Sequence, residues 1–157
     1  MRILIISSYL PFPLFSGGHI RLYNIVKRLT EKNHQVTLIC EKRENQTEED
    51  INEIAKICKQ VITVERKKQW SLQNILQTGF SKKSFLITGH TNEDMQRKMV
   101  ELLKNNSFDL IHVETSYVMQ NVPQTHIPIV LVEHNIEYLV YKRFLNQVVR
   151  KRFEHQS

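Results

Sequence analysis

Short apolar segments rich in Ile, Val and Leu recur along the chain, and longer segments with a different period separate them. The apolar segments are residues 2–7 (RILIIS), 34–40 (HQVTLIC), 59–65 (KQVITVE), 108–114 (FDLIHVE) and 127–133 (IPIVLVE). Continuous apolar runs of this length are typical of strands that are buried on both faces of a parallel sheet. We therefore expect these segments to be the strands of one such sheet.

Between the apolar segments, hydrophobic residues recur with the spacing of one helix face. These residues are Leu22, Ile25, Val26 and Leu29; Ile51, Ile54, Ala55 and Cys58; and Met95, Met99, Leu102 and Leu103. Thr47 and Asp50 predict a capping box at the start of the second helix, and Asn92 predicts an N-cap for the third. The alternation predicts a Rossmann-like α/β fold, with an open parallel sheet, right-handed crossovers and helices on both faces.

Two segments depart from this alternation. Residues 66–89 are basic at both ends and predict a short helix in an excursion from the sheet. Residues 136–153 predict an amphipathic helix, with an apolar stripe opposite a basic face. The basic residues are Lys142, Arg143, Arg150, Lys151 and Arg152. Because no strand follows this helix, we expect residues 1–157 to be a single domain that is shortened at its C-terminal end.

Composition narrows the class of protein. The chain has 157 residues, a formal net charge of +6 and no apolar run of the roughly 18 residues that a membrane span needs. We therefore expect a cytoplasmic protein.

The basic residues are scattered and aromatic residues make up only 8%, without an RNA-binding signature, which argues against a nucleic-acid partner. Cys40 and Cys58 form no metal-ligand pattern and are interpreted as reduced, packed thiols; no metal is expected.

The connection after the first apolar segment is unusually long and contains Gly17-Gly18 at the start of a helical pattern. Backbone N–H groups at a helix N-terminus attract anions, so these glycines and Arg21 predict a phosphate site. The alternative is that the glycines supply the positive φ of a turn. A nicotinamide fingerprint is excluded because the third glycine is missing, and a P-loop is excluded because no GK[ST] is present.

Polar residues follow two later strands. His112 lies within residues 108–114 and is expected to be a core or sheet-edge histidine, whereas Glu114 ends that segment. His134, Asn135 and Glu137 come just after residues 127–133. Ligands in open parallel sheets bind beyond the carboxyl ends of the strands, which makes His134 a candidate site residue. Asn135 fits an N-cap of the last helix equally well.

These segments together resemble family 4 glycosyltransferases. The opening, "MRILIISSYLPFPLFSGGHIRLYNIVKRLTEKNHQVTLIC", resembles the family's first strand, its two-glycine loop and the following helix and strand. "FDLIHVE" is similar to the family's fourth-strand segment. "IPIVLVEHNIEYLVYKRF" is similar to a subgroup with an HN-x-E signature. "VEH" departs from the commoner Thr-x-His pattern, so Glu133 receives no role.

The resemblance implies the GT-B architecture, in which two Rossmann-like domains face each other across a cleft. It implies transfer of a sugar, with retention of configuration and without a metal or other cofactor, from a nucleotide-diphosphate sugar to a glycan or lipid-linked acceptor. This chain resembles the N-terminal, acceptor-side half; the donor-binding half is absent, so we expect the chain alone to be inactive. The resemblance also makes peripheral contact of the basic helix face with an anionic membrane an expectation; the alternative is that the apolar stripe packs on the domain's own sheet and the charges are solvated.

The resemblance also gives roles to individual residues. His134 matches the catalytic histidine of the family. Gly17, Gly18 and Arg21 would bind the donor diphosphate, while Glu114, Asn135 and Glu137 would bind acceptor hydroxyls. Two alternatives stay open at this point: a non-catalytic nucleotide- or sugar-binding module of the same fold, and part of a GT-B nucleotide-sugar epimerase.

Overall fold

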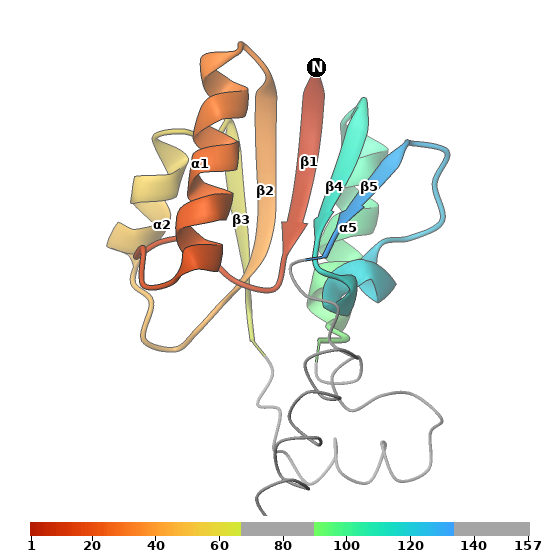
Figure 1. Cartoon of the computed structure of the whole chain (residues 1–157). Coiled ribbons are helices and arrows are strands. Elements are labelled where there is room, and N and C mark those ends of the chain that lie inside the picture. Colours follow the sequence, from red (N-terminus) through yellow and green to blue (C-terminus); the bar gives the residue numbers. More distant parts are fainter. Residues whose placement is uncertain (67–89, 134–157) are drawn as a thin grey trace, which may run out of the picture.

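The computed structural model describes residues 1–66 and 90–133 of the chain. Within these residues, the expected sheet is present (Figure 1). Its strands are β1 (Arg2–Ser7), β2 (Gln35–Lys42), β3 (Gln60–Glu65), β4 (Leu110–Glu114) and β5 (Ile129–Val132). All paired strands are parallel, and the strand order is β3-β2-β1-β4-β5. The prediction of an open parallel α/β sheet is confirmed.

Helices cover both faces of the sheet, as the sequence predicts (Figure 1). On one face, α1 (Gly17–Glu31) and α2 (Glu48–Ala55) pack over a core that includes Ile5, Leu22 and Ile54. On the other face, α5 (Glu93–Asn105) and the 3-10 helix η1 (Ser116–Asn121) pack over a second core. Because successive side chains of a strand point to opposite faces, β1 and β2 contribute to both cores.

The helix starts follow from their capping residues. Thr47 and Asp50 form the predicted capping box of α2, in which each side chain accepts a hydrogen bond from the other residue's backbone N–H. Asn92 caps α5, with its side-chain oxygen 3.1 Å from Asp94 N and 3.3 Å from Met95 N. Both local predictions are therefore confirmed.

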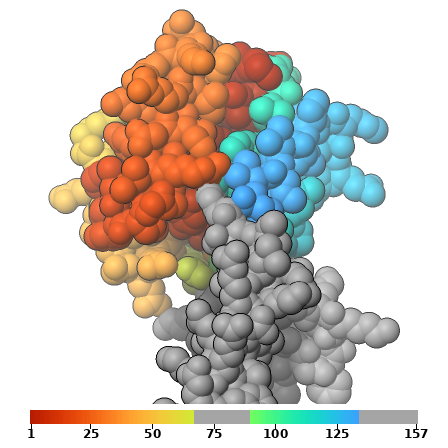
Figure 2. All heavy atoms as spheres, viewed as in Figure 1, coloured from red at the N-terminus to blue at the C-terminus, as the bar shows by residue number. Residues whose placement is uncertain are grey.

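The expectation that every strand is buried on both faces is wrong at the edges of the sheet. The interior strands β1, β2 and β4 are mostly buried, whereas β3 is largely half-buried. In β5, Ile129, Val130 and Leu131 are exposed, and Figure 2 shows atoms of this part of the chain, in blue, on the surface. An apolar run alone does not distinguish a central strand from an edge strand, because burial depends on the neighbours.

Other sequence predictions are tested in part. Cys40 is buried and Cys58 is half-buried; both are free thiols packed into the α1–α2 core, as expected. Burial raises the pKa of Cys58 to about 12. No helix among the described residues is long and apolar enough to span a bilayer. The predicted helix within residues 66–89 and the predicted basic helix over 136–153 lie outside the described residues.

Candidate functional site

Polar side chains gather where the order of the strands reverses, between β1 and β4. The chain passes from β1 through β2 to β3 and then returns to the other side of β1 to form β4. Ligands of open parallel sheets bind beyond the carboxyl ends of the strands at such a reversal. Ser7, the last residue of β1, is in register with Glu114, the last residue of β4. The candidate site is built around this pair.

The long β1–α1 loop is held at several points. Ser7 Oγ donates to Tyr9 O at 2.9 Å and accepts from Tyr9 N at 3.2 Å. Further along the loop, Leu10 is completely buried in the α1–α2 core. Gln46, itself buried, donates from Nε2 to Phe12 O at 2.7 Å. The loop is therefore packed against the domain and hydrogen-bonded to it, and it leads to the start of α1 (Figure 1).

Gly17 and Gly18 are the first two residues of α1, and neither has a positive φ. The alternative that these glycines provide the positive φ of a turn is therefore wrong. A Cβ at Gly17 would meet nothing within 4 Å, and one at Gly18 would lie 3.4 Å from Tyr9 Oη. The N-cap residue Ser16 makes no side-chain capping bond, because its hydroxyl lies 2.7 Å from His19 Nδ1. The first turn thus presents backbone N–H groups beside open space.

Glu114 joins β4 to α1 and to the β1–α1 loop through its buried carboxylate. Arg21 Nη1 donates to Glu114 Oε1, and the Tyr9 hydroxyl lies 3.3 Å from the same oxygen. The Tyr9 hydroxyl also lies 3.3 Å from Gly18 O, so its single proton is shared between two acceptors. His112 Nε2 lies 2.7 Å from Glu114 Oε2, which requires the proton on that nitrogen. We refer to Tyr9, Arg21, His112 and Glu114 as the Glu114 network.

The environment sets the protonation of two rings at this edge. Burial, followed by the charge of Glu114, raises the pKa of Tyr9 well above its usual value, so the phenol keeps its proton and acts as a donor. Burial, followed by the positive charge of Arg43, lowers the pKa of His19 below its usual 6.5. His19 is therefore mainly neutral at pH 7, and Arg21 brings a positive charge into contact with the Glu114 carboxylate.

A second buried carboxylate lies on the opposite face of the sheet. Glu41 follows Cys40 on β2 and so points toward the face that α5 covers. Its Oε2 lies 3.0 Å from His90 Nδ1, and its Oε1 has no hydrogen-bond partner within residues 1–66 and 90–133. The His90 ring stacks on Tyr117 with centroids 5.5 Å apart, and Asn121 Nδ2 donates to His90 O at 2.8 Å.

Thr115, the residue after Glu114, has an unusual backbone conformation. Its φ is 85° and its ψ is 144°, a region populated almost entirely by glycine. Thr115 N donates to Val132 O at 2.9 Å, which ties this turn to β5. The Thr115 hydroxyl is buried and has no hydrogen-bond partner among the residues that the structure describes. Strained, incompletely bonded residues of this kind cluster at functional sites.

The structure brings together part of the residue set that the sequence predicts. Arg21 and Glu114 are in direct contact, and Gly18 is linked to Glu114 through Tyr9. The predicted site residues His134, Asn135 and Glu137 lie outside the described residues.

Sequence reasoning missed two members of the Glu114 network. His112 is expected to be a core or sheet-edge histidine, and it is indeed largely buried, but its partner is Glu114. The signal for this pair is the i, i+2 spacing on one strand, which places both side chains on the same face. Tyr9 carries no comparable local signal, because its contacts depend on the path of the loop.

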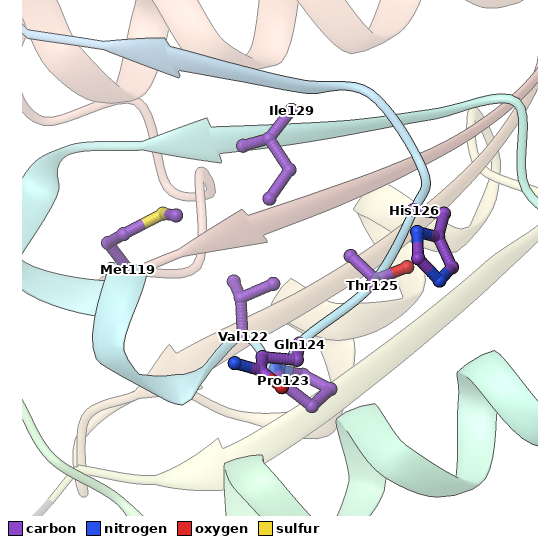
Figure 3. Close-up of a pocket in the computed structure, with 7 residues that line it drawn as sticks. All are labelled: Met119, Val122, Pro123, Gln124, Thr125, His126 and Ile129. Atoms are coloured by element: carbon purple, nitrogen blue, oxygen red, sulfur yellow. The ribbon is translucent and has the colours of Figure 1, made fainter.

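A separate pocket of about 630 Å³ lies beside the edge strand β5 (Figure 3). Its lining residues are Met119, Val122, Pro123, Gln124, Thr125, His126 and Ile129. In the close-up, Met119 on η1 and Ile129 on β5 border the same hollow. The lining includes no member of the Glu114 network, so this pocket and the candidate site are distinct.

Comparison with known sequences shows the family of this chain. The sequence model of glycosyltransferase family 4 matches residues 15–156. The chain belongs to this family. The matched region begins at Phe15 and includes every site residue that the sequence predicts, from Gly17 to Glu137. Glycosyl transfer is accordingly the type of activity to which this domain contributes, and its substrates are a sugar donor and an acceptor.

Solved structures support the fold of this family 4 domain. Two crystal structures of the C-terminal domain of a hydrogenase from Pyrococcus furiosus superpose with a TM-score of 0.55 each. They are 17% and 18% identical in sequence, cover 83% and 84% of this chain, and are each covered over 90% of their own length. At this level of identity the likeness concerns the fold alone. No curated protein sequence gives a significant match.

Proposed function

We propose that this family 4 domain is the acceptor-side half of a retaining GT-B glycosyltransferase that uses a nucleotide-diphosphate sugar. In this proposal, the backbone N–H groups of Gly17 and Gly18, together with Arg21, bind the donor diphosphate. His134 acts at the transferred sugar, and Asn135 and Glu137 bind acceptor hydroxyls. No metal takes part, and the domain alone does not turn over.

The observation that carries the proposal is the uncapped start of α1 beside the strand reversal. Its two glycines have helical rather than positive φ, the space over Gly17 is open, and no acidic residue lies in the first turn. A helix N-terminus of this kind favours anions through its N–H groups and its dipole. Arg21 adds a half-exposed guanidinium one turn further along the helix. Preorganised donors of this type stabilise the charge on a departing diphosphate.

A glycine substitution tests the diphosphate site. Gly17→Ala fits the structure, because nothing lies within 4 Å of the added Cβ, yet this methyl group would stand where the ligand approaches the backbone. Calorimetric titration of the chain with uridine and guanosine diphosphates should give a Kd of roughly 1 mM, or about −4 kcal/mol, since the other half supplies most nucleotide contacts. Gly17→Ala should weaken this binding several-fold. Low-micromolar binding would instead favour a self-sufficient nucleotide-binding module.

The role of His134 is tested in the enzyme that contains both domains. His134→Ala should lower turnover by about 10²–10³-fold, the range typical of one positioned polar group in an active site. His126→Ala is the matched control, because His126 is exposed and precedes β5, whereas His134 follows that strand in the sequence. Equal turnover per folded molecule in the two variants would remove His134 from the mechanism.

Membrane contact is a separate part of the proposal. Lys142, Arg143, Arg150, Lys151 and Arg152 lie outside the described residues, and their sequence pattern predicts a basic helix face. Each such charge near an anionic surface contributes about 1 kcal/mol. The chain should therefore sediment with anionic vesicles at low salt and not with neutral ones. If it stays in the supernatant with anionic vesicles, this contact is absent.

A further inference from the structure

We propose that Glu114 is a positioning residue: it fixes Arg21 and Tyr9 at the strand reversal and does not itself contact the transferred sugar or the acceptor. This inference rests on the proposed function for the identity of the ligand, a diphosphate. It replaces the acceptor contact that the sequence predicts for Glu114.

The first argument is burial. The side chain of Glu114 has no exposed area, whereas the side chain of Arg21 is 37% exposed. A sugar hydroxyl has no direct path to a carboxylate that the protein covers completely. The same pair therefore has one member that faces inward and one that reaches solvent.

The second argument is the occupation of both carboxylate oxygens. Oε1 accepts from Arg21 and lies within hydrogen-bond distance of Tyr9 Oη, and Oε2 accepts from His112 Nε2. These three donors fill most of the acceptor capacity of a carboxylate that is fully buried, so an acceptor hydroxyl would need both an opening in the protein and space beside them. Because His112 holds the second oxygen, the carboxylate cannot rotate away from Arg21 without breaking that bond.

The third argument is that contact with Glu114 orders the Arg21 side chain and leaves some of its N–H donors for a ligand. A guanidinium carries five N–H donors, and Nη1 is directed at Glu114, so donors remain for a second anion. A free arginine side chain loses rotamer entropy when it is fixed in one place. Contact with Glu114 fixes it before a ligand arrives. Tyr9, whose hydroxyl contacts the same carboxylate, also lies within hydrogen-bond distance of Gly18 O and so links Glu114 to the start of α1.

The positioning role and a simple charge effect predict opposite changes in diphosphate affinity when Glu114 is neutralised. As a mere neighbouring negative charge, Glu114 would repel a diphosphate, and its neutralisation would strengthen binding. As a positioning residue, it lowers the cost of ordering Arg21, and its neutralisation weakens binding. The isosteric change Glu114→Gln therefore separates the two roles.

The experiment uses ¹⁵N-labelled chain and inorganic pyrophosphate as the probe, at constant ionic strength. One readout, without ligand, is the Arg21 Nε–Hε NMR signal, assigned with Arg21→Lys; a fixed guanidinium gives a distinct, slowly exchanging signal. The other readout is the pyrophosphate Kd from chemical-shift titration. The matched control is Asp109→Asn. Asp109, just before β4, also forms an ion pair with an arginine, Arg2 on β1.

We expect a distinct Arg21 signal in the unmodified chain and in Asp109→Asn, and its loss in Glu114→Gln. Pyrophosphate binding should weaken about tenfold in Glu114→Gln, equivalent to 1.4 kcal/mol, and stay within about twofold in Asp109→Asn. Should Glu114→Gln fail to fold, Glu114→Asp keeps the charge on a shorter side chain and should show a partial loss of both readouts. A retained Arg21 signal, or tighter binding, in the folded Glu114 variant would overturn the inference. If the unmodified chain binds no pyrophosphate while the Arg21 signal still depends on Glu114, the diphosphate site fails and the positioning contact stands.

Discussion

Glu114 and Glu41 are buried carboxylates at the carboxyl ends of their strands, β4 and β2, but they have different surroundings. Among the described residues, Glu114, on the α1 face, is contacted by the side chains of Tyr9, Arg21 and His112, and both of its oxygens are engaged. Glu41, on the α5 face, contacts His90, and its other oxygen is buried with no hydrogen-bond partner in the described part of the chain. Their exposed fractions, 0% and 1%, are nearly identical. Burial alone does not distinguish their roles.

The difference lies in how completely each charge is compensated. A buried charge with several donors fixes the groups around it, whereas a charge with a single donor depends entirely on that partner. The Glu114 network ties three segments of the chain together at the strand reversal. The Glu41–His90 pair links only the end of β2 to the residues before α5. The first arrangement is suited to holding a binding site, and the second is sensitive to the loss of one contact.

The largest effect is expected for removal of the partner of Glu41. His90→Phe keeps a ring against Tyr117 but leaves the Glu41 carboxylate buried without a donor. Removing one member of a buried pair typically costs about 3–5 kcal/mol, and we expect a loss of that size in chemical denaturation. Adding Glu41→Gln to His90→Phe removes the unpaired charge and should restore much of the loss. A loss below about 1 kcal/mol would mean that other groups compensate Glu41.

A direct comparison of Glu114→Gln with Glu41→Gln comes next in size. At position 114, the amide NH₂ of glutamine faces a donor, so at least one charge-assisted bond is lost, at a cost of about 2 kcal/mol. At position 41, the glutamine oxygen can still accept from His90, and the buried charge disappears, so the change should stay within about 1 kcal/mol. Equal losses, measured at the same pH by urea denaturation, would contradict the contrast between the two carboxylates.

Much of the fold could be predicted from the sequence, because each element carries its own local signal. The apolar runs predict the strands, and the Thr47 box and the Asn92 cap predict two helix starts. The exposure of β5 could not be predicted, because Ile129–Leu131 have the composition of a buried strand and only the sheet order makes them an edge.

The site divides in the same way. Glu114 and Arg21 could be selected as candidates from their places after a strand and in a helix turn, but their contact joins positions 93 residues apart. The role of Tyr9 follows from the path of an irregular loop, which no periodicity encodes. The Glu41–His90 pair likewise depends on tertiary packing across 49 residues. Long-range polar contacts are thus the part of this site that local sequence patterns do not reveal.

A smaller effect is expected for Tyr9→Phe, which tests how the Glu114 network extends to α1. The change removes the hydroxyl that is shared between Gly18 O and Glu114 Oε1 and leaves the ring in place. The loss of one such bond should lower the free energy of unfolding by about 1 kcal/mol. Tyr23→Phe, on the same helix as Gly18, is a suitable control. If Tyr9→Phe has no effect beyond this control, Tyr9 does not contribute to the network.

The smallest effect is expected at Asp109, the exposed counterpart of the two buried carboxylates. Asp109 lies 2.8 Å from Arg2 Nη2 and accepts from Arg2 N at 2.7 Å; these bonds lower its pKa from 3.8 to about 2. A depressed carboxyl pKa stabilises the fold above the unfolded value, and this contribution disappears as pH falls through the folded value. The stability difference between the unmodified chain and Asp109→Asn should therefore be constant above about pH 5, fall as the pH drops, and vanish only below pH 2. Because the pair is exposed, high salt should also reduce the difference. A difference that keeps its neutral-pH size at pH 2 would show that Asp109 acts through packing rather than charge.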